Sequence, residues 1–206
     1  MGSVLADRFE YVGLEPDVTS FATAEERVGN RGRIINGTVE DLAASELFDV
    51  LCAFEVLEHI EDDEAALTRW LEHVRPGGWV LVSVPQGRRR FGPQDEWVGH
   101  FRRYDKSDLV ALLERCRLSD VALIAYGFPL GNALDATRNL LARHRGVASS
   151  RDVRTGASGR WLQPPAWAAQ GTRAFTFPFR LLQRPFARTS RGVGLVARAR
   201  VPSRGV

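Results

Sequence analysis

Short apolar runs alternate along the chain with stretches in which apolar residues recur every three or four positions. Apolar, branched and aromatic runs bounded by turn residues predict β-strands, whereas the longer period predicts helices with one buried face. The predicted strands are residues 9–14, 33–36, 48–54, 79–84 and 121–126. The predicted helices cover residues 19–28, 62–74 and 105–116, and Asp105 and Asp108 form the acid-x-x-acid opening of the last one.

The helix that starts at Asp62 and Asp63 carries the clearest helical stripe. The stripe consists of Leu67, Trp70, Leu71 and Val74, at positions i, i+3, i+4 and i+7. Pro76-Gly77-Gly78 is expected to end this helix, because proline and glycine are typical just beyond a helix end. Residues 48–54 are almost entirely apolar, which is typical of a parallel strand covered on both faces.

The alternation of strands and helices predicts an α/β fold. Each parallel connection needs a crossover, so we expect a Rossmann-like, mostly parallel sheet with helices on both faces. Residues 193–201 resemble a closing edge strand. We expect one domain over residues 1–206, with a flexible loop at 146–160 and a basic, aromatic extension at 161–206 that includes the last strand.

The charges are divided unevenly between the two parts of the chain. Residues 1–137 hold 14 basic and 24 acidic residues, whereas residues 138–206 hold 14 arginines and one acid, Asp152. Such a tail can meet phosphate, an anionic membrane surface or an acidic substrate, or pair with the acidic half of its own chain. No aromatic-interleaved nucleic-acid motif accompanies the arginines, which favours solvation and pairing within the chain over nucleic-acid binding. Peripheral membrane contact and the oligomeric state stay open.

Aromatic residues are dense within the basic extension. They could form a substrate lid, a membrane-surface segment or packing at the far edge of the sheet. They are Trp161, Trp167, Phe175, Phe177, Phe179 and Phe186.

The remaining composition points to an unexported protein with reduced thiols. No strongly apolar stretch reaches the roughly 18 residues that cross a bilayer, and the N-terminus lacks a basic-then-apolar pattern. We therefore predict a cytoplasmic location. Cys52 and Cys116 both lie in apolar periodic segments, which favours buried thiols over a disulfide.

Acidic residues follow the first two predicted strands. In open α/β sheets a ligand binds beyond the carboxyl ends of the strands. Glu15 is therefore placed to accept hydrogen bonds from the two hydroxyls of a ribose, although it could equally be a turn carboxylate before Pro16. Glu40 and Asp41 could face a nucleoside base, and Asp41 could instead cap the turn at Leu42.

Five ordered blocks of sequence resemble the class I S-adenosylmethionine-dependent methyltransferases, particularly their small-molecule branch. The blocks are Tyr-Val-Gly-Leu-Glu-Pro-Asp (11–17), Gly-Thr-Val-Glu-Asp-Leu (37–42), Phe-Asp-Val-Leu-Cys-Ala-Phe-Glu-Val-Leu-Glu-His-Ile (48–60), Arg-Pro-Gly-Gly-Trp-Val-Leu-Val-Ser-Val-Pro (75–85) and Gly-His-Phe-Arg-Arg-Tyr (99–104). The resemblance covers roughly residues 9–126.

The resemblance implies a site for S-adenosylmethionine. It implies that Glu15 holds the ribose, and that the turn of Thr38, Val39, Glu40 and Asp41 lines the adenine. It also implies that Ala53, Phe54 and Glu55 lie beside the cofactor. The family's first strand and glycine-rich turn have no counterpart here, because the ribose-binding acid is already residue 15. We therefore expect that the N-terminal strand of the fold is missing and that this chain starts too late.

Glu55, Glu58 and His59 form a second group of candidate residues, together with His100. The spacing i, i+3 and i+4 would bring the first three to one face of a helical turn. Two carboxylates and imidazole suit a divalent ion such as Mg, Mn or Zn, which could lower the pKa of a substrate hydroxyl. The small-RNA 2′-O-methyltransferases and ubiquinone-pathway O-methyltransferases look similar here and use such residues for a metal. In many other relatives the same residues only cap and pack the turn.

His100 is the preferred catalytic candidate. It lies between a predicted strand and the next helix, and a neutral imidazole can take a proton near pH 7. The alternative is a helix-entry histidine, with Arg102, Arg103 and Tyr104 in a salt-bridged surface turn. Methyl transfer depends mainly on in-line approach, so a dedicated base is not obligatory.

The sequence thus predicts transfer of a methyl group from S-adenosylmethionine to an oxygen, nitrogen or carbon atom of a small molecule. One alternative is a non-catalytic methyltransferase-like module that has lost the cofactor and works through its basic region. A second alternative is an RNA methyltransferase that uses the arginine-rich tail, whose RNA binding would weaken steeply with salt.

Overall fold

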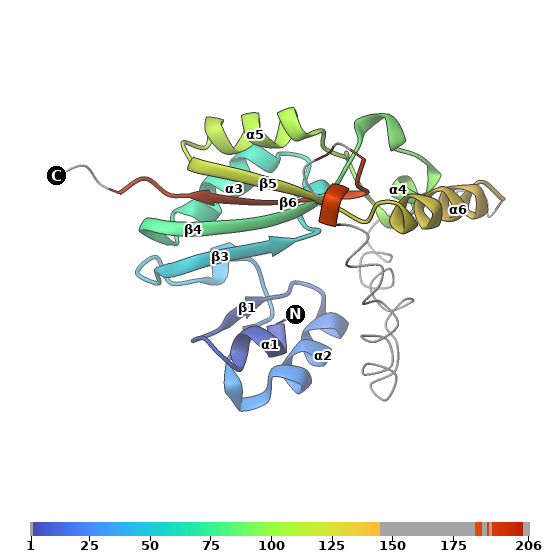
Figure 1. Cartoon of the computed structure of the whole chain (residues 1–206). Helices are drawn as coiled ribbons and strands as arrows, with labels where there is room; N and C mark the ends of the chain where they lie inside the picture. Colours follow the sequence, from blue (N-terminus) through green and yellow to red (C-terminus); the bar gives the residue numbers. More distant parts are fainter. Residues whose placement is uncertain (1, 145–183, 187–188, 190, 204–206) are drawn as a thin grey trace. The chain divides into compact units, whose positions relative to one another are not determined.

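The computed structural model describes residues 2–144, 184–186, 189 and 191–203. Within it the chain forms two compact units, residues 1–46 and 47–206, and each is described by itself (Figure 1). The single domain expected over residues 1–206 stays a prediction. The loop expected at 146–160 and most of the extension at 161–206, including Trp161, Trp167, Phe175, Phe177 and Phe179, lie outside the described residues.

The first unit is a small α/β arrangement with a two-stranded parallel sheet. Strand β1 (Val12–Leu14) pairs with β2 (Arg33–Ile35). Helix α1 (Gly2–Ala6) precedes β1, and helix α2 (Val18–Val28) connects the two strands. Asp17 caps α2, because its carboxylate accepts a hydrogen bond from the Ser20 backbone N–H at 2.8 Å. The predicted strands and helix of this region are confirmed, with β1 shorter than expected.

The second unit is built on a four-stranded sheet in the order β3-β4-β6-β5. These strands are β3 (Phe48–Phe54), β4 (Val74–Pro85), β6 (Gly194–Arg200) and β5 (Ser119–Tyr126). Strands β3 and β4 are parallel, and β6 is antiparallel to both β4 and β5, so β3, β4 and β5 all run in one direction. The mostly parallel α/β fold is confirmed.

The sequence suggested that the last strand closes the sheet at its edge, but the structure places this strand elsewhere. Strand β6 lies inside the sheet, where Arg198 is in register with Leu81 of β4 and Ala122 of β5. Its buried face explains the placement, because Leu195, Ala197 and Ala199 are at most 1% exposed. The small alanines and Leu195 alternate with outward-facing residues, as expected for an inner strand covered on one face.

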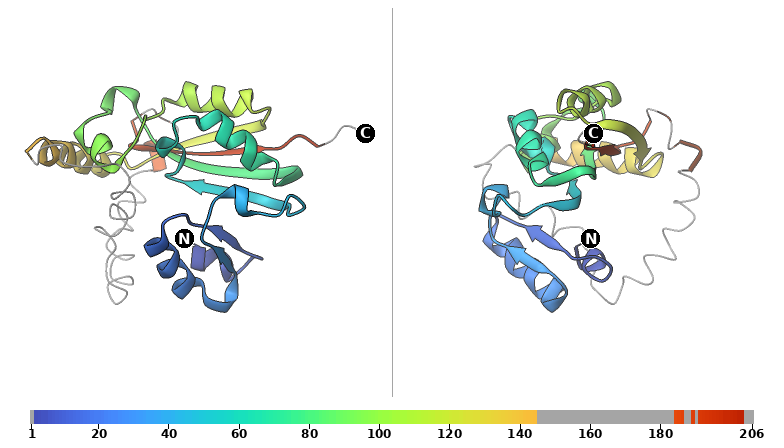
Figure 2. Two further views of the ribbon diagram at one scale, coloured as in Figure 1. Left: turned by 180° about the vertical axis from the view of Figure 1, so that it is seen from behind. Right: turned by 90° about the vertical axis from the view of Figure 1, so that its left-hand side faces the viewer.

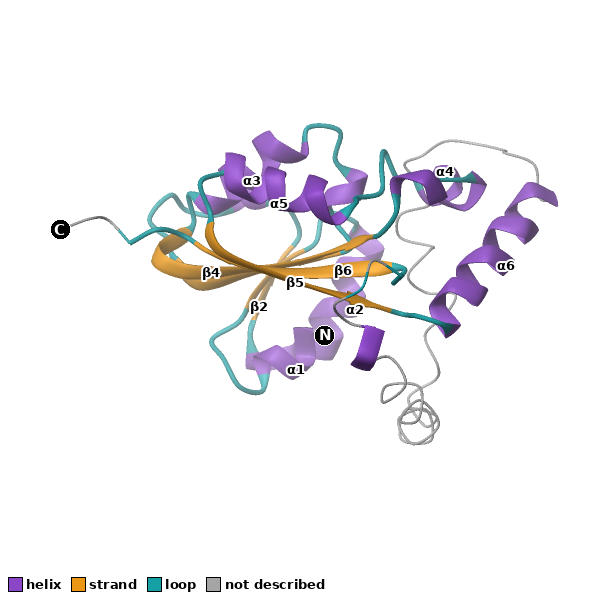
Figure 3. Cartoon of the chain, turned by 45° about the horizontal axis from the view of Figure 1, so that its top comes forward, coloured by secondary structure: helices purple, strands orange, loops and turns teal. Residues whose placement is uncertain are grey.

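Helices α3 (Asp63–Leu71) and α5 (Lys106–Arg115) cover one face of this sheet (Figures 2 and 3). Their apolar residues form the core with Val80, Val82 and Val84 of β4. Asp105 and Asp108 form the predicted capping box of α5, with the Asp105 N–H donating to the Asp108 carboxylate at 3.1 Å. The core residues contributed by the helices are Leu67, Leu109, Leu112 and Leu113.

Two expectations about β3 are wrong, because residues on the opposite face of the sheet are exposed. Val50 is 48% exposed and Cys52 is also exposed, so this strand is not covered on both faces and Cys52 is not a buried thiol. The reason is that α3 and α5 both pack on the face that carries Ala53. Cys116 follows α5 and is half-buried, and neither cysteine forms a disulfide.

The segment Pro76-Gly77-Gly78 does not end a helix. Helix α3 ends at Leu71, and Val74 already begins β4, which includes all three residues. Gly77 has a φ of 80°, and the pairing with β3 shifts register between Phe48 and Val50. The glycines therefore serve an irregular strand rather than a helix end.

Two further helices flank the segment that follows β4. Helix α4 (Pro93–Val98) precedes His100, and α6 (Leu130–His144) packs against α4. Phe186 is described, and its ring meets that of Phe128 at 4.6 Å between centroids. Among the described helices none is both long enough and apolar enough to cross a membrane.

Candidate active site

The candidate site of the second unit lies at the carboxyl edge of its sheet. Glu55 and the 3₁₀ turn η3 (Leu57–His59) follow β3, and residues 86–105 follow β4. Since β3, β4 and β5 run in one direction, their carboxyl ends meet at this edge, which is where α/β sheets bind ligands.

Glu55 links three strand ends. Its Oε1 accepts a hydrogen bond from Ser83 Oγ at 2.8 Å and from the Tyr126 hydroxyl at 3.1 Å. Its φ is 56°, a left-handed conformation that costs energy in a non-glycine residue and is enriched at functional sites. Burial and the adjacent Glu55 carboxylate raise the pKa of Tyr126, so its hydroxyl stays a donor.

Gly194 provides the space for the Tyr126 ring. A Cβ at this position would lie 2.3 Å from Cζ of Tyr126. The first residue of β6 therefore contributes to the site by having no side chain.

The carboxyl group of Glu58 is buried and makes no hydrogen bond within the described residues. The residue is 0% exposed, and both Oε1 and Oε2 lack a partner there. Burial, together with the nearby charges of Glu55 and Asp95, raises the pKa of Glu58 to about 8, against a smaller lowering by its backbone. The carboxyl group is therefore mostly protonated at neutral pH.

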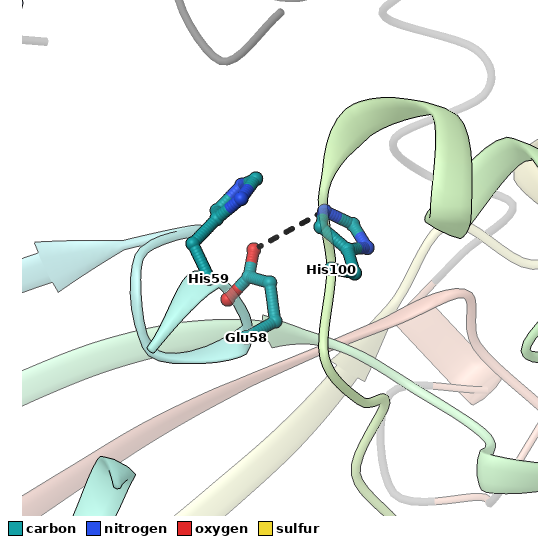
Figure 4. Close-up of side chains that lie close together, drawn as sticks. All are labelled: Glu58, His59 and His100. Carbon is teal, nitrogen blue, oxygen red and sulfur yellow. Dashed lines mark ion pairs between the residues drawn. The ribbon is translucent and has the colours of Figure 1, made fainter. Parts of the chain in front are cut away.

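Two imidazoles adjoin Glu58 (Figure 4). His100 Nε2 lies 4.0 Å from Glu58 Oε1, and the rings of His59 and His100 meet edge to face at 4.6 Å between centroids. One ligand atom from each of the three residues lies within 4.8 Å of the others. Burial, with a smaller effect of His100, lowers the pKa of His59 to about 4, so His59 is neutral with a lone pair available.

His100 is held from its other side by a buried acid. Its Nδ1 lies 2.9 Å from Asp95 Oδ1, which also accepts a hydrogen bond from Arg103 Nε at 2.7 Å. The two terminal nitrogens of Arg103 donate to the two carboxylate oxygens of Asp135 on α6, both at 3.0 Å. Burial raises the pKa of Asp95, but the hydrogen bonds from His100 and Arg103 outweigh it and the pKa is lowered overall.

These positions show which of the predicted site residues lie together. Glu58, His59 and His100 come together, whereas Glu55 is engaged by Ser83 and Tyr126 and is not a member of this group. A helical turn does not bring Glu55 to one face with Glu58 and His59, because Glu55 precedes a short 3₁₀ turn and has a positive φ.

The surface turn considered around His100 is also corrected. Arg103 is 6% exposed and Tyr104 is 3% exposed, so both are buried. The Tyr104 hydroxyl donates to Asp63 Oδ2 at 2.6 Å, and Arg102 pairs with Asp63 Oδ1 at 3.1 Å. The salt bridges are present, but they join the turn to α3 instead of facing solvent.

The cofactor candidates of the first unit lie at the carboxyl edge of β1 and β2. Glu15 follows β1, and its Oε1 accepts from the Asp17 N–H at 3.1 Å. The Gly37 N–H donates to the Glu15 carbonyl at 3.2 Å, which fixes the turn after β2 beside Glu15. The turn-carboxylate role of Glu15 is therefore present, and it involves one of the two carboxylate oxygens.

The turn after β2 is a 3₁₀ helix over Val39–Asp41. Asp41 Oδ2 accepts from the Thr38 N–H at 2.8 Å, and the Thr38 hydroxyl donates to Glu40. Asp41 thus caps this turn, which is one of the two roles that the sequence allowed, and Val39 is buried beneath it. In the second unit Ala53 is 8% exposed at the end of β3, and Phe54 is half-buried.

The sequence analysis did not predict the residues that form hydrogen bonds with Glu55, His100 and Arg103. Ser83, Asp95, Tyr126 and Asp135 were not singled out. Asp95 could have been noticed from the Gly92-Pro93 pair, which marks a helix start with an acid in its first turn. Nothing in the local sequence marks Tyr126 or Asp135 as neighbours of residues 55 and 103.

Glu58, His59 and His100 together form a group that fits a divalent cation. A buried carboxyl without a partner among the described residues and two imidazoles, one of them neutral, form a donor set that first-row metals accept. The fit concerns Glu58, His59 and His100, without the predicted Glu55.

Part of the chain is similar in sequence to known methyltransferases. Residues 2–82 match the family model described as a methyltransferase domain. A ubiquinone biosynthesis O-methyltransferase from Azorhizobium caulinodans is 37% identical over 79 residues, which is 36% of this chain and 31% of that protein. The chain spans about a third of the length of the curated relatives it matches.

Solved structures agree on the fold. The N-methyltransferase NodS from Bradyrhizobium japonicum, in complex with S-adenosyl-L-homocysteine, is 12% identical with a TM-score of 0.50, covering 94% of this chain and 67% of that one. The [4+2]-cyclase SpnF is 18% identical with a TM-score of 0.57, covering 98% and 71%. Residues 2–82 thus resemble the methyltransferase domain family, and the fold of the chain is similar to that of these solved structures.

Proposed function

We propose that the protein transfers the methyl group of S-adenosylmethionine to an oxygen, nitrogen or carbon atom of a small molecule. The observation that carries this proposal is that the segment matching the methyltransferase domain places an acid, Glu15, directly after its first described strand. The fold alone would not suffice, because a protein named as a cyclase shares it.

Glu15, together with the turn of residues 38–41, would bind the nucleoside part of the cofactor. A carboxylate offers about four acceptor positions, and the hydrogen bond from the Asp17 N–H occupies one of them in Glu15. Glu15 can therefore still accept hydrogen bonds from ribose hydroxyls, while Val39 and Glu40 would border the base. That Ala53, Phe54 and Glu55 lie beside the cofactor stays a prediction.

When bound, S-adenosylmethionine supplies a sulfonium methyl group that an acceptor lone pair can attack in line. His100 would take the proton that the acceptor loses, at Nε2, because its Nδ1 is engaged with Asp95. The half-buried imidazole and the protonated Glu58 beside it keep negative charge low around the incoming acceptor.

A divalent cation is a second arrangement for the same group. Glu58, His59 and His100 would hold it, and when bound it would lower the pKa of an acceptor hydroxyl. The buried Glu58 carboxyl, which no described residue pairs, favours this arrangement. Isothermal titration of EDTA-treated protein with Mg²⁺, Mn²⁺ and Zn²⁺ tests it: heat that Glu58→Gln abolishes supports the cation, and no heat with any of the three rejects it.

The function is tested by calorimetry with S-adenosylmethionine and S-adenosylhomocysteine on the whole chain. We expect saturable binding that Glu15→Ala weakens at least about tenfold, since one lost hydrogen bond to a charged group is worth about 1.5–3 kcal/mol. Glu26→Gln on the exposed part of α2 is the matched control and should bind as the wild type does. Absent binding would favour the non-catalytic module, and salt-sensitive RNA binding would favour the RNA methyltransferase.

A further inference from the structure

The imidazole of His100 is held by contacts on both its backbone and its ring. Its backbone N–H donates to the Asp95 carbonyl at 2.9 Å, and the N–H of Phe101 donates to the Glu58 carbonyl at 2.7 Å. The ring is 14% exposed and packs edge to face on His59. Its Nδ1 is hydrogen-bonded to Asp95 Oδ1.

We infer that Asp95 is a positioning residue that fixes His100 in the Nδ1–H tautomer and directs its Nε2 lone pair towards Glu58. This inference rests on the proposed function, in which Nε2 accepts the proton of the acceptor. An ionised carboxylate can only accept hydrogen bonds, so Nδ1 must carry the hydrogen. In the neutral ring Nε2, which lies 4.0 Å from Glu58 Oε1, then keeps its lone pair.

The two oxygens of Asp95 have different partners. Oδ2 accepts from the Gly92 N–H at 3.0 Å and caps the start of α4. Oδ1 accepts from His100 Nδ1 and from Arg103 Nε. A buried carboxylate that served only to neutralise Arg103 would not need the imidazole, because Asp135 already pairs with both terminal nitrogens of Arg103.

Helix α6 supports this arrangement from outside. Asp135 of α6 holds Arg103, and Asn139 Oδ1 accepts from the Gln94 N–H at 3.3 Å. Arg103 in turn keeps Asp95 ionised in its buried position, where Asp95 is 1% exposed. A chain of hydrogen bonds therefore connects α6 to the ring of His100 through Arg103 and Asp95.

The test compares Asp95→Asn with Asp135→Asn. Both remove one charge from the same buried network, but only Asp95 contacts the imidazole. Two-dimensional ¹H–¹⁵N NMR of the histidine ring nitrogens, on EDTA-treated protein at one pH, reports the tautomer, and a His100→Gln sample assigns the signals of His100.

We expect the Nδ1–H tautomer in the wild type and in Asp135→Asn, and a shift towards Nε2–H in Asp95→Asn, whose amide N–H can donate to Nδ1. With methyl transfer as the second readout, Asp95→Asn should lower kcat about 10–100-fold, the loss typical of an orienting partner, with KM for S-adenosylmethionine unchanged. Glu96→Gln, an exposed neighbour, should match the wild type.

A wild-type Nε2–H tautomer, or an unchanged tautomer in Asp95→Asn, overturns the inference. So does a kcat loss in Asp135→Asn as large as that in Asp95→Asn. If Asp95→Asn does not fold, the tautomers of the wild type and of Asp135→Asn still test the inference. Failure of the proposed function would show differently, as a wild-type protein that has the expected tautomer but transfers no methyl group.

Discussion

The Nε2 atom of His100 lies 4.0 Å from Oε1 of Glu58, a buried carboxyl oxygen with no hydrogen-bond partner in the described part of the chain. Such an orphaned group costs free energy of folding, about 1–3 kcal/mol for a buried donor or acceptor. Costs of this kind are expected at functional sites, where local rules of stability are broken. Glu58 therefore offers a direct comparison between stability and activity.

Replacing Glu58 by methionine should raise the free energy of unfolding by about 1–3 kcal/mol, because a side chain of similar size no longer buries two unpaired oxygens. Methyl transfer should fall in the same variant. Urea denaturation of EDTA-treated protein measures the stability. Glu61→Gln is the exposed control and should change neither property.

The stability difference should also depend on pH. The Glu58 carboxyl keeps its proton up to about pH 8 in the folded protein but loses it near its ordinary pKa of 4.5 when unfolded. Folding therefore takes up a proton between these values, so wild-type stability falls as pH rises from about 4.5 to 8. The advantage of Glu58→Met should be larger at pH 8 than at pH 5. Parallel curves for the two proteins would contradict the raised pKa.

Tyr104 and Asp63 provide a second stability test, at the point where the turn after His100 joins α3. Tyr104→Phe removes a 2.6 Å hydrogen bond to a buried carboxylate, for which we expect a loss of about 1.5–3 kcal/mol. Asp63 keeps its ion pair with Arg102, which limits the loss. Tyr126→Phe, at a more exposed residue, should cost less than Tyr104→Phe in the same urea experiment. Equal losses would show that burial does not set the strength of these contacts.

Gly194 and Tyr126 should be energetically coupled. A Cβ at residue 194 would lie 2.3 Å from the Tyr126 ring, so Gly194→Ala must displace the ring and its hydrogen bond to Glu55. We expect a destabilisation of about 1–3 kcal/mol, as for other overpacked sites. Tyr126→Ala removes the clash, so the double variant should be less destabilised than the sum of the two single variants. Additive losses would mean that the ring moves aside freely.

Elements that are marked by a pattern of neighbouring residues could be predicted from the sequence. Residues 48–54 were predicted as a strand with the bounds observed for β3, and Asp105 and Asp108 marked the start of α5 through their capping box. The position of β6 between β4 and β5 could not be read in this way. It depends on pairing with residues at least 68 positions away for β5 and more than 100 for β4, and such pairing leaves no trace in the local pattern.

The candidate site was predictable to a similar degree. Glu58 and His59 are neighbours in sequence, and His100 follows the next strand, so the carboxyl edge of a parallel pair brings them together. Glu55 was included because its spacing suggested a helical turn, whereas it has a positive φ and lies outside the group of Glu58, His59 and His100. Asp95 was missed because an acid five residues before a histidine, across a glycine turn at Gly99, follows no regular period.

Gly78 shows how a residue taken for a helix stop serves the sheet instead. A Cβ at this position would lie 2.8 Å from the Arg75 carbonyl oxygen and 2.9 Å from that of Asp49, and backbone atoms cannot move aside as a flexible side chain can. Gly78→Ala should therefore destabilise the protein by about 1–3 kcal/mol by disturbing the pairing of β3 with β4. Gly29→Ala is the comparison variant, because nothing lies within 4 Å of its Cβ and only its φ of 57° opposes the change. We expect Gly78→Ala to lower the urea midpoint more than Gly29→Ala does; if Gly29→Ala lowers it as much, close approach of the β3 and β4 backbones is not what requires glycine at residue 78.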